Sequence, residues 1–223
     1  MRAYSIAIDG PAGAGKSTIA KALAKKRNLI YVDTGAMYRA MALYFVRNNI
    51  CPEETKRLED ACPEIEVSIA YENGEQTVFL NGENVSALIR TPEIGNMASA
   101  ISVNGKIREK LVELQRDLAR NQSVVMDGRD IGTCVLPDAA VKIYLTASVE
   151  VRAERRYAEL CKKGEICQFE QLKQEITERD RRDMNRAISP LRKAEDAVEL
   201  DTSELTVEQV VEVMNRIVEE RLS

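Results

Sequence analysis

Short hydrophobic runs alternate with amphipathic segments along most of this chain. The runs are brief and rich in apolar residues on successive positions, which is typical of strands buried on both faces. Between them the apolar positions recur every three or four residues, as on one face of a helix. This order predicts an α/β fold with a parallel sheet flanked by helices. The predicted strands are Ala3–Ile8, Leu29–Val32, Ser123–Met126, Val141–Leu145 and Ala197–Leu200.

The helical pattern follows most of these strands. Helices are predicted over Thr18–Arg27, over Ala36–Asn48 with Asp33 or Thr34 as N-cap, and after Thr91-Pro92 with a break near Asn104-Gly105. A long charged segment from Glu150 to about Arg186 is also predicted helical, broken near Lys163-Gly164. The last helix starts at a Thr206-x-x-Gln209 capping box, and its regular apolar stripe favours packing on the core over subunit pairing.

One part of the chain has a different period. Ile65, Val67, Ile69 and Tyr71 alternate with polar residues, Asn73-Gly74 is a strong hairpin signal, and Thr77–Leu80 returns. This antiparallel pattern interrupts the strand–helix alternation. We therefore interpret residues 62–90 as an inserted subdomain.

The first strand leads into a phosphate-binding motif. The pattern G-x-x-x-x-G-K-[ST] is formed by Gly10, Pro11, Ala12, Gly13, Ala14, Gly15, Lys16 and Ser17. Backbone N–H groups of such a loop surround phosphate oxygens, and the next helix adds its positive N-terminal end. Lys16 is expected to reach the β- and γ-phosphates, and the Ser17 hydroxyl to sit on Mg²⁺.

Composition narrows the class of protein. The chain of 223 residues has a net charge of −4, with 32 basic and 36 acidic residues, which argues against broad nucleic-acid binding. No apolar run approaches the ~20 residues that span a bilayer, and the first strand starts too early for a signal peptide. Five cysteines without a C-x-x-C pair favour reduced thiols and a cytoplasmic location. The chain contains no histidine, which excludes catalytic triads that need histidine and metal sites with histidine ligands.

Three polar segments follow predicted strands: Gly10–Ser17, Asp33–Arg39 and Asp127–Asp130. Ligands bind at the carboxyl ends of parallel strands, so we expect these segments to converge on one crevice. Asp9, just before the phosphate loop, is interpreted as a structural brace of that loop, and Asp127 as a metal-site carboxylate that reaches Mg²⁺ through water.

The phosphate loop does not identify the phosphoryl acceptor. Arginines cluster near the predicted site, including two groups at helical spacing. Without the phosphate loop, the helices that carry these arginines would be interpreted as solvent-exposed, salt-bridged helices, since Glu175–Arg179 and Glu178–Arg182 are favourable i,i+4 pairs. Beside a phosphate loop they favour a kinase, because two phosphorylated substrates repel and need positive charge around them.

The absence of histidine is compatible with a nucleoside monophosphate acceptor. The second pKa of such a phosphate is ~6, so its oxygen is anionic at neutral pH and needs no general base. A hydroxyl acceptor, as in a shikimate-type kinase, would need a carboxylate base such as Asp33 or Asp130. A regulatory protein that hydrolyses nucleotide slowly is a further alternative, although the lack of an [NT]-K-x-D motif counts against a GTPase.

Four motifs in order resemble those of the bacterial cytidylate kinases, which belong to the nucleoside monophosphate kinase family. The resemblance extends from Ile6 to about Leu200. The motifs are Ile8–Ser17, Asp33–Arg39, Asp127–Thr133 and Arg179–Arg186. It implies one domain, with a core of residues 1–61, 92–147 and 197–223, a monophosphate-binding insertion at about 62–91 and a lid at about 148–190.

The resemblance also implies roles for individual residues in a monomeric enzyme that uses ATP, CMP or dCMP, and Mg²⁺, without a nucleic-acid or membrane partner. Thr34, Arg39, Arg129 and Arg186 would bind the acceptor phosphate; Ser99, Arg108 and Asp130 the cytosine; Arg179 and Asp183 the pentose. The loop, Thr18 and Arg155 would bind ATP, and Lys16, Arg129, Arg152, Arg156 and Arg186 would be catalytic. Arg152, Arg155 and Arg156 would begin a lid that closes over ATP and excludes water.

Overall fold

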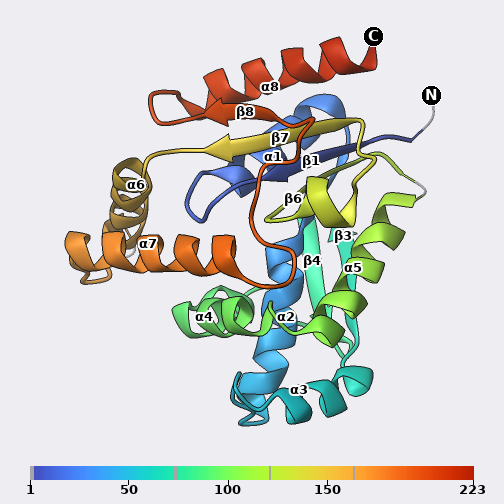
Figure 1. The fold of residues 1–223 in the computed structure, drawn as a ribbon, viewed down its shortest axis with the longest axis vertical. Coiled ribbons are helices and arrows are strands. Elements are labelled where there is room, and N and C mark those ends of the chain that lie inside the picture. Colours follow the sequence, from blue (N-terminus) through green and yellow to red (C-terminus); the bar gives the residue numbers. More distant parts are fainter. Residues whose placement is uncertain (1–2, 73–74, 121, 163) are drawn as a thin grey trace. The chain divides into compact units, whose positions relative to one another are not determined.

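Strands and helices alternate in the structure as the hydrophobic pattern predicts (Figure 1). The computed structural model describes residues 3–72, 75–120, 122–162 and 164–223. The chain divides into two compact units. The first combines Met1–Leu29 with Ser123–Ser223, and the second is Ile30–Gln122.

A parallel sheet forms the centre of the first unit. Strand β6 (Val124–Gly128) pairs with β1 (Ser5–Asp9), β1 with β7 (Val141–Thr146), and β7 with β8 (Val198–Asp201), all parallel. In the register, Ile6 of β1 lies between Val125 of β6 and Val141 of β7. The side chains of the central strand β1 are almost fully buried, which explains its continuous apolar sequence.

Two helices complete the core of this unit. Helix α1 (Lys16–Arg27) buries Ile19, Leu23 and two alanines. It begins two residues earlier than the pattern indicated, because Gly15 takes a left-handed conformation and turns the loop directly into the helix. Helix α8 (Val207–Leu222) starts at the predicted capping box and packs against α1 and β7. The prediction that the last helix packs on the core is thereby confirmed.

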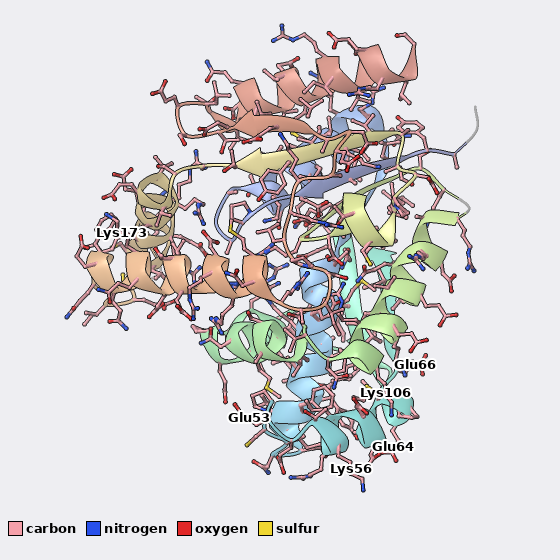
Figure 2. The ribbon with its side chains drawn as sticks, viewed as in Figure 1. Glu53, Lys56, Glu64, Glu66, Lys106 and Lys173 are labelled. Atoms are coloured by element: carbon pink, nitrogen blue, oxygen red, sulfur yellow. The ribbon has the colours of Figure 1, made fainter. Side chains whose placement is uncertain are left out.

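The charged segment forms two helices. Helix α6 (Val149–Lys162) and helix α7 (Phe169–Asn185) lie against each other (Figure 1). The predicted break is real: Gly164 has a φ of +76°, while Lys163 lies outside the described residues. Lys173 of α7, labelled in Figure 2, forms an ion pair with Glu150 of α6. The rings of Tyr157 and Phe169 meet edge to face with centroids 6.1 Å apart.

The second unit is organised around helix α2 (Thr34–Arg47). Met37, Met41 and Phe45 on this helix have no exposed surface and form its buried side. Helices α2 and α4 (Pro92–Ile101) make the most extensive helix–helix contact of the unit, and α4 and α5 (Gly105–Arg120) are separated as predicted near Asn104-Gly105. The described part of this unit also contains strand β2 (Ile30–Asp33), helix α3 (Thr55–Ala61) and two short 3₁₀ turns.

The predicted antiparallel pattern forms a small sheet in this unit. Strands β3 (Val67–Glu72) and β4 (Glu75–Leu80) pair from Val67↔Leu80 onward, as a hairpin requires. The turn predicted at Asn73-Gly74 lies outside the described residues. A third strand, β5 (Glu83–Asn84), was not predicted, because two exposed polar residues give no strand pattern. Within the described part of the chain, no helix combines the length and apolarity needed to cross a bilayer.

Candidate active site

Glycine conformation shapes the phosphate loop. Gly10, Gly13 and Gly15 have φ values of +150°, +77° and +83°, which side-chain-bearing residues rarely adopt. Gly10 also lies against the sheet: a Cβ built there would be 1.9 Å from the carbonyl oxygen of Leu145. The loop therefore depends on glycine at this position for both conformation and space.

Lys16 lies inside the loop that precedes it. Its side chain is buried, and Nζ donates a hydrogen bond of 2.7 Å to the carbonyl oxygen of Pro11. Burial lowers the pKa of Lys16 well below its usual value, and the nearby Arg129 guanidinium lowers it further. Asp127 and Asp9 oppose this effect in part. An amine held in this way favours an anion at its side, because a phosphate would restore the stability of the charged form.

Ser17 and Asp127, the two residues predicted to lie on the metal side of the nucleotide, lie next to each other. The Ser17 hydroxyl donates to Oδ2 of Asp127 at 3.0 Å. Mg²⁺ prefers oxygen ligands and usually takes only one or two from protein beside phosphate oxygens and water. Within the described residues there is no group of three or more His, Cys, Asp or Glu side chains arranged for a metal. This hydroxyl–carboxylate pair fits a metal ion that arrives with a nucleotide.

Asp9 braces a turn at the end of the neighbouring strand. Its two carboxylate oxygens accept hydrogen bonds of 2.7 Å from the backbone N–H groups of Ile131 and Gly132. These residues open a π-helical turn, Ile131–Val135, that the sequence did not predict. Burial raises the pKa of Asp9 from its usual 3.8 to about 6, although both backbone hydrogen bonds lower it. Asp9 therefore braces the turn that follows Asp130, whereas the sequence interpretation was a brace for the phosphate loop.

Asp9 gives an expected pH dependence of stability. Because its pKa is higher in the folded chain, the unfolded chain releases this proton first as the pH rises. The free energy of unfolding should therefore fall by about 3 kcal/mol between about pH 4 and pH 6, and the Asp9 contribution should be constant above that. The Asp9→Asn variant has no carboxyl group to titrate here. The free energy of unfolding of the variant minus that of the wild type should therefore rise by about 3 kcal/mol from about pH 4 to pH 7. Urea unfolding at both pH values measures the change, and a pH-independent difference would contradict it.

The last two motifs of the first unit are in direct contact. Nε of Arg129 lies 2.9 Å from Oδ2 of Asp183, and Nη2 of Arg186 lies 3.5 Å from Oδ1 of Asp130. Burial acts to raise the pKa of Asp183, but Arg129, Arg179 and Arg186 outweigh it and the net shift is downward. Residues more than 50 positions apart thus form one buried network of arginines and carboxylates.

The three predicted lid arginines have different partners. Arg152 reaches the phosphate loop, where Nη1 donates to the carbonyl oxygen of Ala12 at 2.9 Å. Arg155 donates to the hydroxyl and the carbonyl oxygen of Thr202, at 3.2 and 2.6 Å. Arg156 pairs at 2.9 Å with the exposed Glu159 one turn later on the same helix. In this conformation only Arg152 of the three contacts the phosphate loop within the described residues.

In the second unit, the segment after β2 is held by its own helix cap and by the hairpin. The Asp33 carboxylate caps α2 by accepting from the Ala36 N–H at 2.9 Å. The side-chain amide of Gln76 on β4 pairs with the backbone of Asp33, at 2.7 Å to its N–H and 3.2 Å to its carbonyl. This role of Gln76 is not predictable from the sequence, since no local signal distinguishes it from any other polar strand residue. The next residue, Thr34, is buried.

Arg39 and Arg108 occupy different parts of this unit. Nη1 of Arg39 lies 3.5 Å from the position a Cβ would take on Gly35, one turn earlier, so the guanidinium folds back over the start of α2. Arg108 is buried on α5, where Nη1 donates to the carbonyl oxygen of Ser102 at 3.3 Å. Its guanidinium is 6.0 Å from the centre of the Tyr38 ring. The Ser102 hydroxyl in turn donates to the Ser99 carbonyl at 2.8 Å, so Ser99 and Arg108 share Ser102 as a neighbour.

Comparison with known proteins identifies relatives along almost the whole chain. The family model described as cytidylate kinase matches residues 6–220. The chain is 50% identical over 218 residues to a cytidylate kinase of Bacillus cytotoxicus, covering 98% of this chain and 97% of the relative. It is 49% identical over 212 residues to a cytidylate kinase of Caldicellulosiruptor bescii, covering 95% of this chain and 94% of that relative.

Among solved structures, a gluconokinase from Sinorhizobium meliloti shares the fold. It has a TM-score of 0.51 and 13% sequence identity, with 98% of this chain and 94% of that chain covered. At this identity the likeness concerns the fold alone, and it supports the predicted α/β architecture.

Proposed function

Because the chain belongs to the cytidylate kinase family, we propose that it transfers the γ-phosphoryl group of ATP to CMP or dCMP. The products are ADP and CDP or dCDP. The observation that carries the proposal is the buried Lys16 amine inside the phosphate loop, next to the network of Arg129, Asp183, Arg186 and Asp130. Such a cluster offers positive charge both to a donor triphosphate and to an acceptor phosphate.

The donor is ATP bound by the loop from Gly10 to Ser17, together with Thr18 and Arg155. Backbone N–H groups of the loop bind phosphate oxygens, and the Lys16 ammonium carries the charge for the β- and γ-phosphates. Ser17 would hold Mg²⁺, with Asp127 acting on it through water. The bound ion would neutralise phosphate charge and orient the triphosphate.

The acceptor phosphate is bound by Thr34, Arg39, Arg129 and Arg186. In this proposal Ser99, Arg108 and Asp130 recognise the cytosine, while Arg179 and Asp183 bind the pentose. The acceptor oxygen is already anionic near neutral pH, because the second pKa of a phosphate monoester is ~6. Catalysis by a chain without histidine then requires positioning and charge neutralisation, and the transfer is in line without a covalent enzyme intermediate.

Arg152 and Arg156 complete the proposed catalytic set on helix α6. Arg152 already contacts the loop, whereas Arg156 is paired with Glu159 on the helix surface. We propose that Arg156 exchanges this exposed partner for phosphate when the substrates are bound. Exposed ion pairs contribute only about 0–1 kcal/mol, so the exchange costs little.

A substrate panel tests the proposed function. With ATP and Mg²⁺ in a coupled ADP assay, CMP and dCMP should be phosphorylated faster than UMP or AMP, and a metabolite with only a hydroxyl acceptor, such as shikimate, should give no turnover. Equal turnover of all nucleotides would contradict the assignment of the base-binding residues. Hydrolysis of ATP without stimulation by CMP would instead support a regulatory nucleotide-hydrolysing protein.

Asp130 is expected to set the preference for cytosine. A buried carboxylate accepts a hydrogen bond from the N4 amine of cytosine, whereas uracil presents an oxygen there. Asp130→Ala should therefore lower the ratio of kcat/KM for CMP to that for UMP by about tenfold or more. Asp138→Ala, at an exposed position eight residues later, is the matched control and should keep the wild-type ratio. An unchanged ratio in Asp130→Ala would assign the discrimination to other residues.

We further propose that the enzyme acts as a monomer in the cytoplasm. The apolar stripe of α8 is packed within its own unit, which supports a core role for this helix over subunit pairing. The five cysteines are all unpaired thiols, which fits a reducing compartment.

A further inference from the structure

Two backbone carbonyl groups and one carboxylate fix the Arg152 guanidinium at the edge of the phosphate loop. Its Nε donates to the carbonyl oxygen of Ala147 at 2.9 Å, and its Nη1 to that of Ala12 at 2.9 Å. Its Nη2 lies 2.6 Å from Oδ2 of Asp180 on α7. A Cβ built on Gly13 would lie 3.4 Å from the Cβ of Arg152, so the whole side chain follows the loop. A guanidinium has five N–H groups, and the contacts of this one within the described residues leave two for a further acceptor.

Asp180 is unusual among the charged residues of its helix. Most acidic side chains of α7 are exposed, but Asp180 and Asp183 are buried, with relative exposures of 7% and 6%. Oδ1 of Asp180 is also buried and has no hydrogen-bond partner among the described residues. A buried carboxylate with one unsatisfied oxygen is costly, and a buried ion pair is at best a weak source of stability. The Asp180–Arg152 pair is therefore better explained by what it positions than by what it adds to folding.

We propose that Asp180 is a positioning residue for the ATP site. Its carboxylate fixes the Arg152 guanidinium against the Ala12 carbonyl, so that the loop and the arginine are already arranged when the triphosphate arrives. Asp180 itself does not touch the nucleotide; it acts through Arg152. A side chain ordered in advance loses less conformational entropy on binding, which strengthens ATP binding in particular. The inference deepens the proposed function and depends on ATP being the donor.

The test compares Asp180→Asn, Arg152→Met and the double variant by calorimetry. Each is titrated with a non-hydrolysable ATP analogue and Mg²⁺, and separately with CMP. Asp180→Asn keeps the shape of the side chain and removes its charge. We expect it to weaken binding of the analogue about five- to twentyfold and binding of CMP less than twofold. In the Arg152→Met background the same substitution should change the analogue Kd less than twofold, because Asp180 then has no arginine to position.

The control is Glu178→Gln, two residues earlier on the exposed side of α7, where Glu178 pairs with Arg181. It should leave both Kd values at the wild-type level. If Asp180→Asn does not fold, Asp180→Glu decides, because it keeps the charge but cannot hold the Arg152 guanidinium in the same place: the analogue Kd should rise at least twofold with the CMP Kd unchanged, and an unchanged analogue Kd would overturn the inference.

Three results would overturn the inference. These are an unchanged analogue Kd in Asp180→Asn, an equal loss for the analogue and CMP, or a further loss of more than twofold when Asp180→Asn is added to Arg152→Met. Because binding of the analogue is measured without turnover, a failure of CMP phosphorylation in the wild-type chain would refute the proposed function separately.

Discussion

Replacing Lys16 with alanine is expected to lower kcat for CMP phosphorylation by about a thousandfold. The amine lies buried inside the phosphate loop, 2.7 Å from the Pro11 carbonyl. Loss of one charge-stabilising group in a site closed to water costs about 10²–10³ in kcat, and a cation beside the transferred phosphoryl group should lie at the upper end. A coupled ADP assay at saturating ATP and CMP measures the effect.

Lys25→Ala is the matched control for this prediction. Lys25 lies on the exposed side of the same helix and carries the same charge, so its removal should change kcat less than twofold. The folded structure should survive in both variants, because Lys16 is a buried cation whose pKa is lowered by the fold and whose loss removes an unfavourable burial. Near-wild-type turnover in Lys16→Ala would exclude this residue from phosphoryl transfer.

Replacing Gly10 with alanine is expected to destabilise the protein by about 4 kcal/mol or more. The added Cβ would lie 1.9 Å from the Leu145 carbonyl oxygen, and the φ of +150° is itself rarely accessible to alanine. Leu145 belongs to β7, which is paired with strands on both sides, so its backbone has little room to shift. Losses of this size are exceptional for single substitutions and indicate backbone conflict. Urea unfolding gives the change in the free energy of unfolding.

Gly95→Ala provides the opposite expectation for the same chemical change. Gly95 lies within α4 and a Cβ there has no atom within 4 Å, so alanine should stabilise the protein by about 0.5–1 kcal/mol through its better helix propensity. Similar stabilities for Gly10→Ala and Gly95→Ala would contradict this account of the loop.

Features with a local cause were predictable from the sequence. The phosphate loop, the capping box at Thr206 and the alternation of Ile65 to Tyr71 each depend on neighbours within a few positions, and all three led to correct elements. The burial of β1 likewise follows from its own composition. Most predicted strand and helix ends lie within two residues of the observed ones, and the remaining differences arise because caps and loop geometry decide where an element ends.

Features created by tertiary contacts were not predictable. The π-helical turn at Ile131–Val135 forms where Asp9, more than 120 positions earlier, accepts two of its N–H groups. Gln76 is positioned only by the backbone of Asp33, 43 residues away. Asp180 belongs to the last motif, in which the sequence predicted binding roles for Arg179 and Asp183 only. The contact between Asp180 and Arg152 becomes visible only in the folded structure. Single-sequence patterns carry no information on such pairs.

The most direct test of the central claim is the balance of products. With limiting CMP and excess ATP and Mg²⁺, chromatography of quenched samples should show CDP and ADP forming in equal amounts until CMP is consumed, with negligible ADP in its absence. This result is expected if the chain passes the phosphoryl group from ATP to CMP. Formation of ADP at the same rate with and without CMP, while CMP stays unchanged, would contradict the account.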